Sequence, residues 1–242
     1  MLILAFESSA KPASVAIYEV SDTTDIITDN NGKLLGMDFQ NSGFSHSRTL
    51  LLMAESLMKS LDIKPTDIGL VAVANGPGSF TGVRIGVSAA KGLAWGLDIP
   101  VCGVSTLEAI AAQTPENGVI ICPVMDARRE QVYNALFKWE NDVLVRLCDD
   151  RAISIEELAA DLIKYDLPCL LAGDGADVCK VGFDRFDNLA APDYRIANES
   201  MRYQTALGVA LTAVKSTPVN ATELEPFYLR PSQAERERQN RT

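Results

Sequence analysis

Apolar residues along the first part of the chain recur at every second position in some stretches and at helical spacing in others. The alternating or continuous apolar runs predict strands over residues 2–7, 13–19, 33–39, 70–74 and 100–104. Between the third and fourth strands, apolar side chains fall on one face of a helix that Ser45 or Ser47 caps and that ends at Leu61. A further helix is expected from about Gly82 to Trp95, before the fifth strand.

The second part of the chain repeats this order of elements. We expect strands over residues 119–125, 131–138, 143–147 and 170–172, and helices over 106–113, after Ser154 and within 201–216. Residues 3–18 and 121–137 share an apolar strand, an acid (Glu7 or Asp126), a turn and a second strand. The pattern predicts a duplicated α/β unit, with an N-terminal lobe over residues 1–104, a C-terminal lobe over 105–230 and a charged tail over 231–242.

Two such lobes with facing acidic turns resemble the actin-like ATPases (the ASKHA fold), an α/β fold in which two ribonuclease-H-like lobes, with mixed sheets flanked by helices, enclose a nucleotide. This resemblance makes six positions candidate nucleotide-binding residues: Glu7, Gly76, Gly78, Asp126, Gly173 and Gly175. Residues 75–82 follow a strand and open a helix, where an anion is favoured. Their glycine spacing is neither that of a Walker A loop nor that of the dinucleotide fingerprint. Structural turns and turn-capping acids are therefore the alternative interpretation.

Charge and the rarer side chains exclude several classes of function. Lys plus Arg number 22 and Asp plus Glu 32, and the net charge of −10 disfavours direct binding of nucleic acid. The five cysteines form no CxxC pair and His46 is the single histidine, so we expect no zinc ribbon, no two-histidine metal site and no cofactor. The start has no basic segment, and the longest apolar stretch, residues 83–97, contains Arg84 and Lys91. We therefore expect no signal peptide, no membrane span and a cytoplasmic protein.

The helix expected after residue 82 carries small residues at a spacing of four, Gly82, Gly86 and Ala90, which form a flat strip. Each interior glycine lowers helix stability by about 1 kcal/mol, so this helix depends on packing against another surface. That surface is either the helix's own domain or a partner protein. The Leu/Met-rich face of the preceding helix favours a partner.

Several stretches of the sequence resemble the TsaB (YeaZ) family: residues 2–18, His46-Ser47, 76–86 with 90–94, 125–129 with 132–133, and 226–230, which is similar to the family's closing strand. The resemblance implies a two-lobed relative of the transferase TsaD that lacks the metal-binding HxxxH motif of TsaD and is not an enzyme. It implies pairing with TsaD, or with a second copy when alone, through two helices of the N-terminal lobe. With TsaE, such an assembly transfers threonylcarbamoyl to the adenosine beside the anticodon, so tRNA is contacted only indirectly.

Carried onto this sequence, the resemblance assigns partner binding to residues of those two helices: His46, Leu50, Met53, Leu57, Val83, Gly86, Val87, Ala90, Lys91 and Ala94. Gly86→Arg or Ala90→Glu is then expected to prevent pairing with TsaD and to leave the fold intact. Glu7 departs from the aspartate usual in the family, which weakens a phosphate-binding role. The competing hypotheses are an autonomous peptidase, an actin-like ATPase, and an interaction module whose partner is not TsaD.

Overall fold

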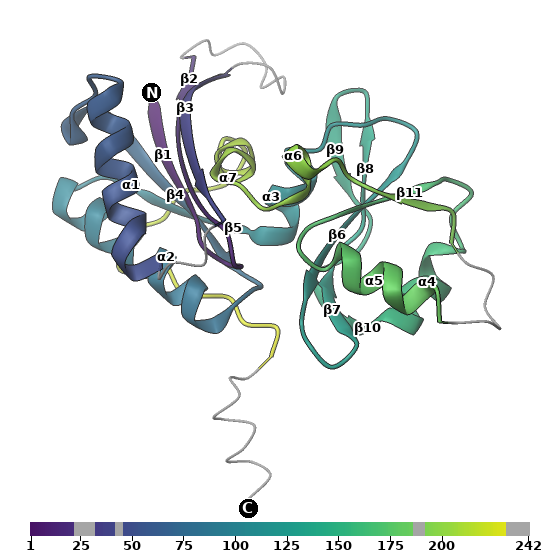
Figure 1. The fold of residues 1–242 in the computed structure, drawn as a ribbon. Coiled ribbons are helices and arrows are strands. Elements are labelled where there is room, and N and C mark those ends of the chain that lie inside the picture. The colour runs from purple at the N-terminus through teal and green to yellow at the C-terminus, as the bar shows by residue number, and fades with distance from the viewer. Residues whose placement is uncertain (22–31, 42–45, 186–191, 231–242) are drawn as a thin grey trace, which may run out of the picture.

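The computed structural model describes residues 1–21, 32–41, 46–185 and 192–230, which form two lobes, each built on its own β-sheet (Figure 1). The turn expected at Asn31, the alternative cap Ser45 and the tail over residues 231–242 lie outside the described residues. A search of the described helices found none with the length and hydropathy of a membrane span.

The first lobe is a five-stranded sheet with helices on both faces (Figure 1). Its strands are β1 (Leu2–Glu7), β2 (Ala13–Val20), β3 (Gly32–Gln40), β4 (Ile68–Gly76) and β5 (Val101–Ser105), in the order β3-β2-β1-β4-β5. β2 runs antiparallel to β1 and β3, whereas β4 and β5 run parallel to β1. One face carries α1 (His46–Ser60) and α2 (Phe80–Leu97), and a 3-10 helix, η1 (Pro65–Asp67), precedes β4. The elements predicted for this lobe are confirmed, with ends shifted by a few residues.

The second lobe repeats this sheet strand for strand. Its strands are β6 (Ile120–Asp126), β7 (Gln131–Asn134), β10 (Arg151–Ser154), β11 (Cys169–Ala172) and β12 (Tyr194–Ile196), in the order β10-β7-β6-β11-β12. Their directions match those of β3, β2, β1, β4 and β5. Helices α4 (Ile155–Leu162) and α5 (Ala176–Phe183) hold the places that α1 and α2 hold in the first unit. The repeat confirms the duplicated unit and the actin-like (ASKHA) fold.

The second lobe also departs from the predicted pattern. The strand expected over residues 131–138 divides into β7 and β8 (Phe137–Glu140). The buried Asn134 side chain donates to the carbonyl oxygens of Pro123 and Ala135, 3.0 Å from each, at the point where the division occurs. β8 pairs with β6 and with β9 (Val143–Arg146). Strands β10 and β12 and helix α5 are additional to the prediction, whereas Ser154 caps α4 as expected, in a capping box with Glu157.

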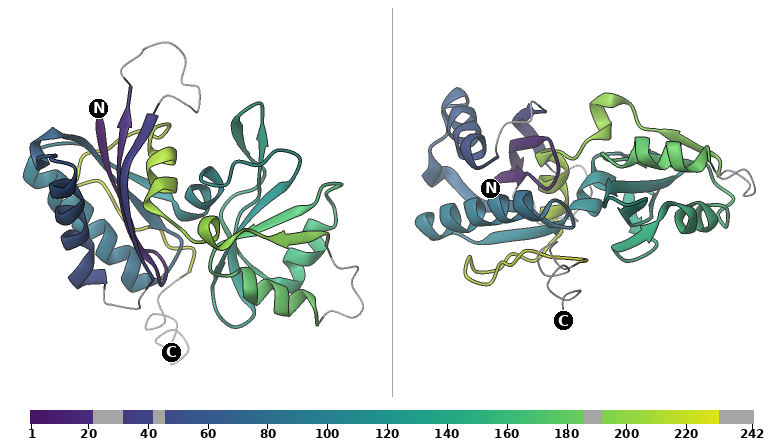
Figure 2. Two further views of the ribbon diagram at one scale, coloured as in Figure 1. Left: turned by 45° about the horizontal axis from the view of Figure 1, so that its top comes forward. Right: turned by 60° about the horizontal axis from the view of Figure 1, so that its bottom comes forward.

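After the second sheet the chain passes through α6 (Glu199–Arg202) and returns to the first lobe (Figure 2). Helix α7 (Ala206–Ala213) packs on the face of the first sheet opposite α1 and α2, and α3 (Thr106–Ala112) lies between α7 and β6. Val219 then pairs with Val101 at the edge of the first sheet, and Leu224 joins the core that contains α2. Residues 105–230 therefore do not pack as one lobe, which differs from the division made from sequence.

The expectation of a closing strand over residues 226–230 is wrong. In the structure this segment has no strand, and residues 229–230 form a bend. The Phe227 N–H donates to the carbonyl oxygen of Asn75 (2.7 Å), and the Asn75 side chain donates to the carbonyl oxygen of Glu225 (3.1 Å). Pro226 between them has no N–H to donate, so a regular ladder cannot form there.

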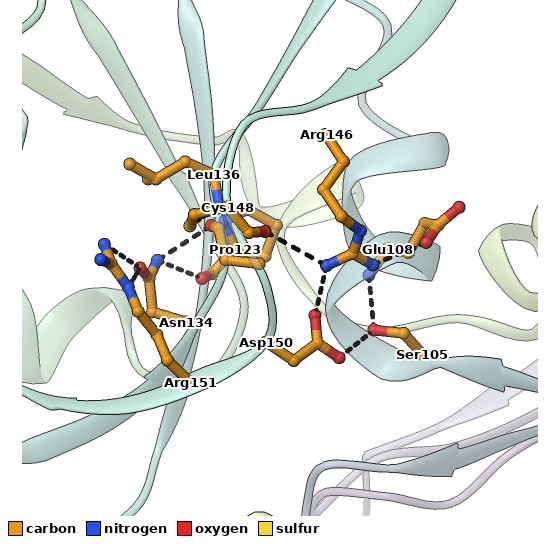
Figure 3. Close-up of polar contacts among 10 residues, drawn as sticks. Ser105, Glu108, Pro123, Asn134, Leu136, Arg146, Cys148, Asp150 and Arg151 are labelled. Atoms are coloured by element: carbon orange, nitrogen blue, oxygen red, sulfur yellow. Dashed lines mark hydrogen bonds and ion pairs between the residues drawn. The ribbon is translucent and has the colours of Figure 1, made fainter.

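Polar contacts join the second lobe to the start of α3 (Figure 3). The Arg146 guanidinium binds Glu108 on α3 and Asp150 before β10, each at 2.6 Å. Ser105, at the end of β5, donates to Asp150 (2.5 Å) and accepts the Glu108 N–H (3.2 Å). Charge-assisted hydrogen bonds of this kind are short and directional. The network therefore holds the end of β5 and the second lobe in one arrangement.

Two glycines of α2 give a matched test of how this helix packs. A Cβ at Gly82 would lie 2.1 Å from the backbone oxygen of Ser8, whereas a Cβ at Gly92 would meet nothing within 4 Å. We expect Gly82→Ala to lower the free energy of unfolding by about 3 kcal/mol, because the backbone must move. Gly92→Ala should raise it by about 0.5–1 kcal/mol through helix propensity. Urea unfolding followed by circular dichroism measures both changes in free energy. Equal changes would contradict the packing of α2 against Ser8, in the turn after β1.

Candidate functional site

Helices α1 and α2 contact each other on the first sheet and leave a groove between their N-terminal halves. The groove has a volume of about 630 Å³. The described residues that line it are His46, Ser47, Leu50, Leu51, Phe80, Thr81, Arg84, Ile85, Ser88 and Ala89. Among these lining residues, Arg84 carries the single permanent charge and there is no acid. The groove, hereafter the α1–α2 groove, is thus largely uncharged, with one arginine.

Most residues predicted to bind a partner face the chain's own core instead. The buried ones are Leu50, Met53, Val83, Gly86, Val87, Ala90 and Ala94, and Leu57 is partly buried against the same core. Gly82 and Gly86 let α2 approach the turn after β1, since a Cβ at Gly86 would lie 2.5 Å from the Ser8 hydroxyl. The flat strip is therefore an internal contact. Gly86→Arg or Ala90→Glu would disrupt the fold itself, which corrects the expectation that the fold would survive.

Lys91 and His46 tie parts of the first lobe together. The Lys91 ammonium donates to the carbonyl oxygens of Thr222 (3.2 Å) and Leu224 (2.8 Å). These bonds hold residues 219–230, hereafter the returning segment, along α2. His46 Nε2 lies 2.8 Å from the carbonyl oxygen of Ala10 and donates to it, so the start of α1 is fixed to the loop between β1 and β2. Lys91 is thus an internal contact, whereas His46 also lines the α1–α2 groove.

The two helices expose other apolar residues. Leu51 is 52% exposed, Leu52 is 63% exposed, and Trp95 on α2 is 78% exposed. Ile85 and Ala89 are partly exposed along the groove. These side chains were not among the predicted partner-binding residues, because the apolar stripe of each helix was expected to face a partner. The signal was present, since Leu51 and Leu52 lie off the stripe that the helical period defines.

A second candidate site lies where the acidic turns meet. Glu7, at the end of β1, is fully buried; its Oε1 accepts the Ser9 N–H (2.6 Å), and its Oε2 has no partner among the described residues. Burial, with the charge of Asp174 adding to it, raises the pKa of Glu7 to about 7. Burial, with the charge of Asp126 adding to it, raises the pKa of Asp174 to about 6. Glu7 and Asp126 are therefore linked electrostatically through Asp174, a carboxyl that the prediction did not include.

The four glycines predicted to bind a nucleotide all make close contacts within the chain. A Cβ added to Gly76 would lie 2.1 Å from the backbone oxygen of Phe227, and one added to Gly78 would lie 2.5 Å from the backbone oxygen of Ser9. In the second lobe, a Cβ added to Gly173 would lie 2.1 Å from the backbone oxygen of Val124, and one added to Gly175 would lie 2.9 Å from the carbonyl carbon of Met125. Gly76 and Gly173 also have positive φ angles of 130° and 110°. These glycines have a structural role, and nucleotide binding by them stays a prediction.

The groups around these carboxyls do not favour a polyphosphate. Asp126 is exposed and accepts the Arg128 N–H (2.7 Å), as a turn-capping residue does. Arg202 lies near Asp174 but is ion-paired with Asp177 (2.5 Å). In the described part of the chain, no three His, Cys, Asp or Glu side chains come together in a way that could hold a metal ion. Carboxylates without a cation repel phosphate.

Replacing Glu7 by glutamine tests its buried state. The unfolded chain releases this proton near pH 4.5 and the folded chain near pH 7, so wild-type stability falls as pH rises through that range. Glutamine does not ionise. The free energy of unfolding of Glu7→Gln, relative to wild type, should therefore grow by up to about 3 kcal/mol between pH 4 and pH 8. Urea unfolding at several pH values measures it, with the exposed Glu140→Gln as control; a difference independent of pH would refute the burial of this carboxyl.

A family model described as "TsaD: tRNA N6-adenosine threonylcarbamoyltransferase" matches residues 40–237. The tRNA threonylcarbamoyladenosine biosynthesis protein TsaB of Bacillus subtilis is 34% identical over 191 residues, which cover 79% of this chain and 82% of that protein. The protein of the same name from Haemophilus influenzae is 25% identical over 247 residues, covering 95% and 94%.

Solved structures agree on the fold. A Pseudomonas aeruginosa protein, described as having similarity to peptidase YEAZ, superposes with a TM-score of 0.75 over 95% of this chain and 99% of that one, at 22% identity. At this identity the likeness concerns the fold. The sequence matches go further, because they extend over most of both chains. The chain belongs to the TsaB family of tRNA threonylcarbamoyladenosine biosynthesis proteins.

Proposed function

We propose that this chain acts in the cytoplasm as a non-catalytic subunit in tRNA threonylcarbamoyladenosine formation, binding the transferase TsaD through the α1–α2 groove and working together with TsaE. In the absence of TsaD, the same surface pairs with a second copy of the chain. Membership of the TsaB family supports the pathway. The observation that carries the partner role is the groove, which the half-exposed Leu51 lines and whose helix α1 also exposes Leu52.

Exposed apolar side chains on two adjacent helices are a common feature of protein interfaces. Leu51, Leu52 and Trp95 are large, well exposed, and carried by the two helices that border the groove. Two helices from this chain and two from a partner form a four-helix contact, which a twofold axis also allows for two copies of the chain. A specific contact of this kind buries at least about 1,000 Å² in total.

The charge distribution favours a subunit over an autonomous enzyme. Glu7, Asp126 and Asp174 form an acidic group that repels an uncompensated nucleotide. The net charge of −10 likewise disfavours direct contact with tRNA, so tRNA is bound by the assembly and not by this chain alone. The competing enzyme hypothesis, a peptidase or an ATPase, depends on Glu7 or Asp126 as an acid or base.

Leu51→Glu tests the groove as the partner-binding surface. A carboxylate at this half-exposed position would replace an apolar contact of the complex and be desolvated there, so co-purification with TsaD from the same organism should be lost. The control is Val143→Glu on β9, which is 54% exposed and far along the chain in the second lobe. It should leave the complex intact. Retention of wild-type affinity by Leu51→Glu, with both variants folded, would place the interface elsewhere.

An activity assay on the purified chain separates the subunit from the enzyme. We expect no hydrolysis of ATP or of peptides above the background of the Asp126→Ala variant, because Asp126 caps a turn and Glu7 is buried in the core. Adding TsaD and TsaE should produce threonylcarbamoyl transfer that Asp126→Ala leaves within about twofold of wild type. Turnover by the chain alone that disappears in Asp126→Ala would support the enzyme hypothesis instead.

A further inference from the structure

Arg84 is held in one orientation at the edge of the α1–α2 groove. Its guanidinium carbon lies 3.8 Å from the centre of the Phe80 ring, and its Nε donates to the Tyr228 hydroxyl (2.8 Å). The two rings stack on each other with centres 4.9 Å apart. Stacking on one face and a hydrogen bond at one edge restrict the rotamers of this long side chain. The charged end of Arg84 is therefore positioned before any partner arrives.

The remaining donors of Arg84 are free within the described part of the chain. A guanidinium has five N–H groups in a planar fork, and the Tyr228 hydroxyl takes one of them. The ion pairs among the described residues do not include Arg84, and the described lining residues of the groove include no acid. Both Nη atoms can therefore donate to a carboxylate that binds in the bidentate fork geometry arginine favours.

The second lobe provides an internal comparison. A groove of about 550 Å³ lies between α4 and α5, which correspond to α1 and α2 in the repeat. Arginines and acids both line it: Arg185 is paired with Glu130 (3.3 Å) and Asp177 with Arg202 (2.5 Å), and Arg129 and Glu156 lie in the same lining. The described lining of this groove thus includes acids as well as arginines, and some of them are paired within the chain. In the α1–α2 groove the charge of Arg84 has no such acid, although the chain as a whole has ten more acids than bases.

We propose that the protein partner of the α1–α2 groove presents an aspartate or glutamate carboxylate to Arg84, flanked by apolar side chains, and that Phe80 and Tyr228 position Arg84 for it. This inference rests on the proposed function and adds the chemistry of the contact. Leu51 and Ile85 beside Arg84 favour a protein surface as the occupant. The net charge of −10 disfavours the phosphates of a nucleic acid, so a carboxylate is the matching anion.

The returning segment is then part of the recognition surface. Tyr228 lies 144 positions beyond Arg84 in the sequence and reaches it because Lys91 and Asn75 hold that segment against α2 and β4. Phe80 and Arg84 come from the first turns of α2 itself. Tyr228 is a positioning residue: its hydroxyl fixes Arg84, and Arg84 makes the contact with the partner.

The test measures the dissociation constant of the chain with TsaD from the same organism, by titration calorimetry, between about 50 and 500 mM NaCl. We expect Arg84→Gln to weaken binding by about 30-fold at low salt and to flatten the salt dependence, because an ion pair is lost. Arg84→Lys, which keeps the charge without the fork, should keep the salt dependence and lose about tenfold in affinity. Tyr228→Phe keeps the ring stack and should weaken binding by about threefold, since only the orientation of Arg84 is loosened.

Controls separate this proposal from the proposed function. Arg185→Gln removes an exposed arginine of the corresponding groove and should change neither affinity nor salt dependence. Each variant is first checked by thermal unfolding. If Leu51→Glu abolishes binding while Arg84→Gln retains wild-type affinity and salt dependence, the carboxylate contact is refuted and the groove stands. If neither variant changes binding, the groove is not the interface and both proposals fail.

A charge exchange identifies the partner's acid. Arg84→Glu should lose binding to TsaD, and one Asp→Lys or Glu→Lys change in TsaD should restore it. Failure of every exposed acid of TsaD to restore binding would overturn the carboxylate contact. Binding of an unmodified tRNA by the chain alone, lost in Arg84→Gln, would also overturn it, because phosphate would then be the anion that Arg84 recognises.

Discussion

The backbone contact between the first turn of α2 and the turn after β1 is the constraint on which the first lobe depends. The Ser8 hydroxyl donates to the carbonyl oxygen of Gly82 (2.9 Å), and the Ser79 N–H donates to that of Ser9 (2.6 Å). Glycine at position 82 leaves room for this approach. Because α2 is seated in this way, its small and β-branched residues meet the sheet, and Arg84 faces outward beside α1. This contact therefore closes the core and decides which side chains of α2 face outward.

The order of strands and helices was predictable, and the direction of the small-residue strip was not. Alternating and helical periods identified β1 to β5, α1 and α2, and the matching acids Glu7 and Asp126 indicated the repeat. Small residues four apart on a helix fit a close approach by any backbone. Whether that backbone is the chain's own depends on a contact between Ser8 and Gly82, 74 positions apart, which no local pattern contains. The elements missed, such as β12, are short, so their periods are weak.

The acidic turns show the same limit in another form. Sequence indicated that Glu7 and Asp126 belong to equivalent turns, but it contained no sign that Glu7 is fully buried while Asp126 is exposed. Nor did the sequence indicate that the charge of Asp174, which follows the strand equivalent to β4, acts on Glu7. The pKa values of Glu7 and Asp174, raised to about 7 and about 6, follow mainly from burial, with the charge of Asp174 adding to the shift of Glu7 and that of Asp126 to the shift of Asp174. Equivalent positions in a duplicated fold thus acquire different electrostatics from the side chains packed around them.

The return of the chain to the first lobe has a consequence for its synthesis. Helix α7 covers one face of the first sheet, and Leu224 belongs to the core on the other face. A ribosome that has released residues 1–112 has therefore produced a sheet whose second apolar face is still open to water. The second lobe must emerge, and residues 206–224 after it, before that face is covered. Helices α1 and α2, which we propose meet a partner, are among the first elements made, but the lobe that supports them is completed only in the final stage of translation.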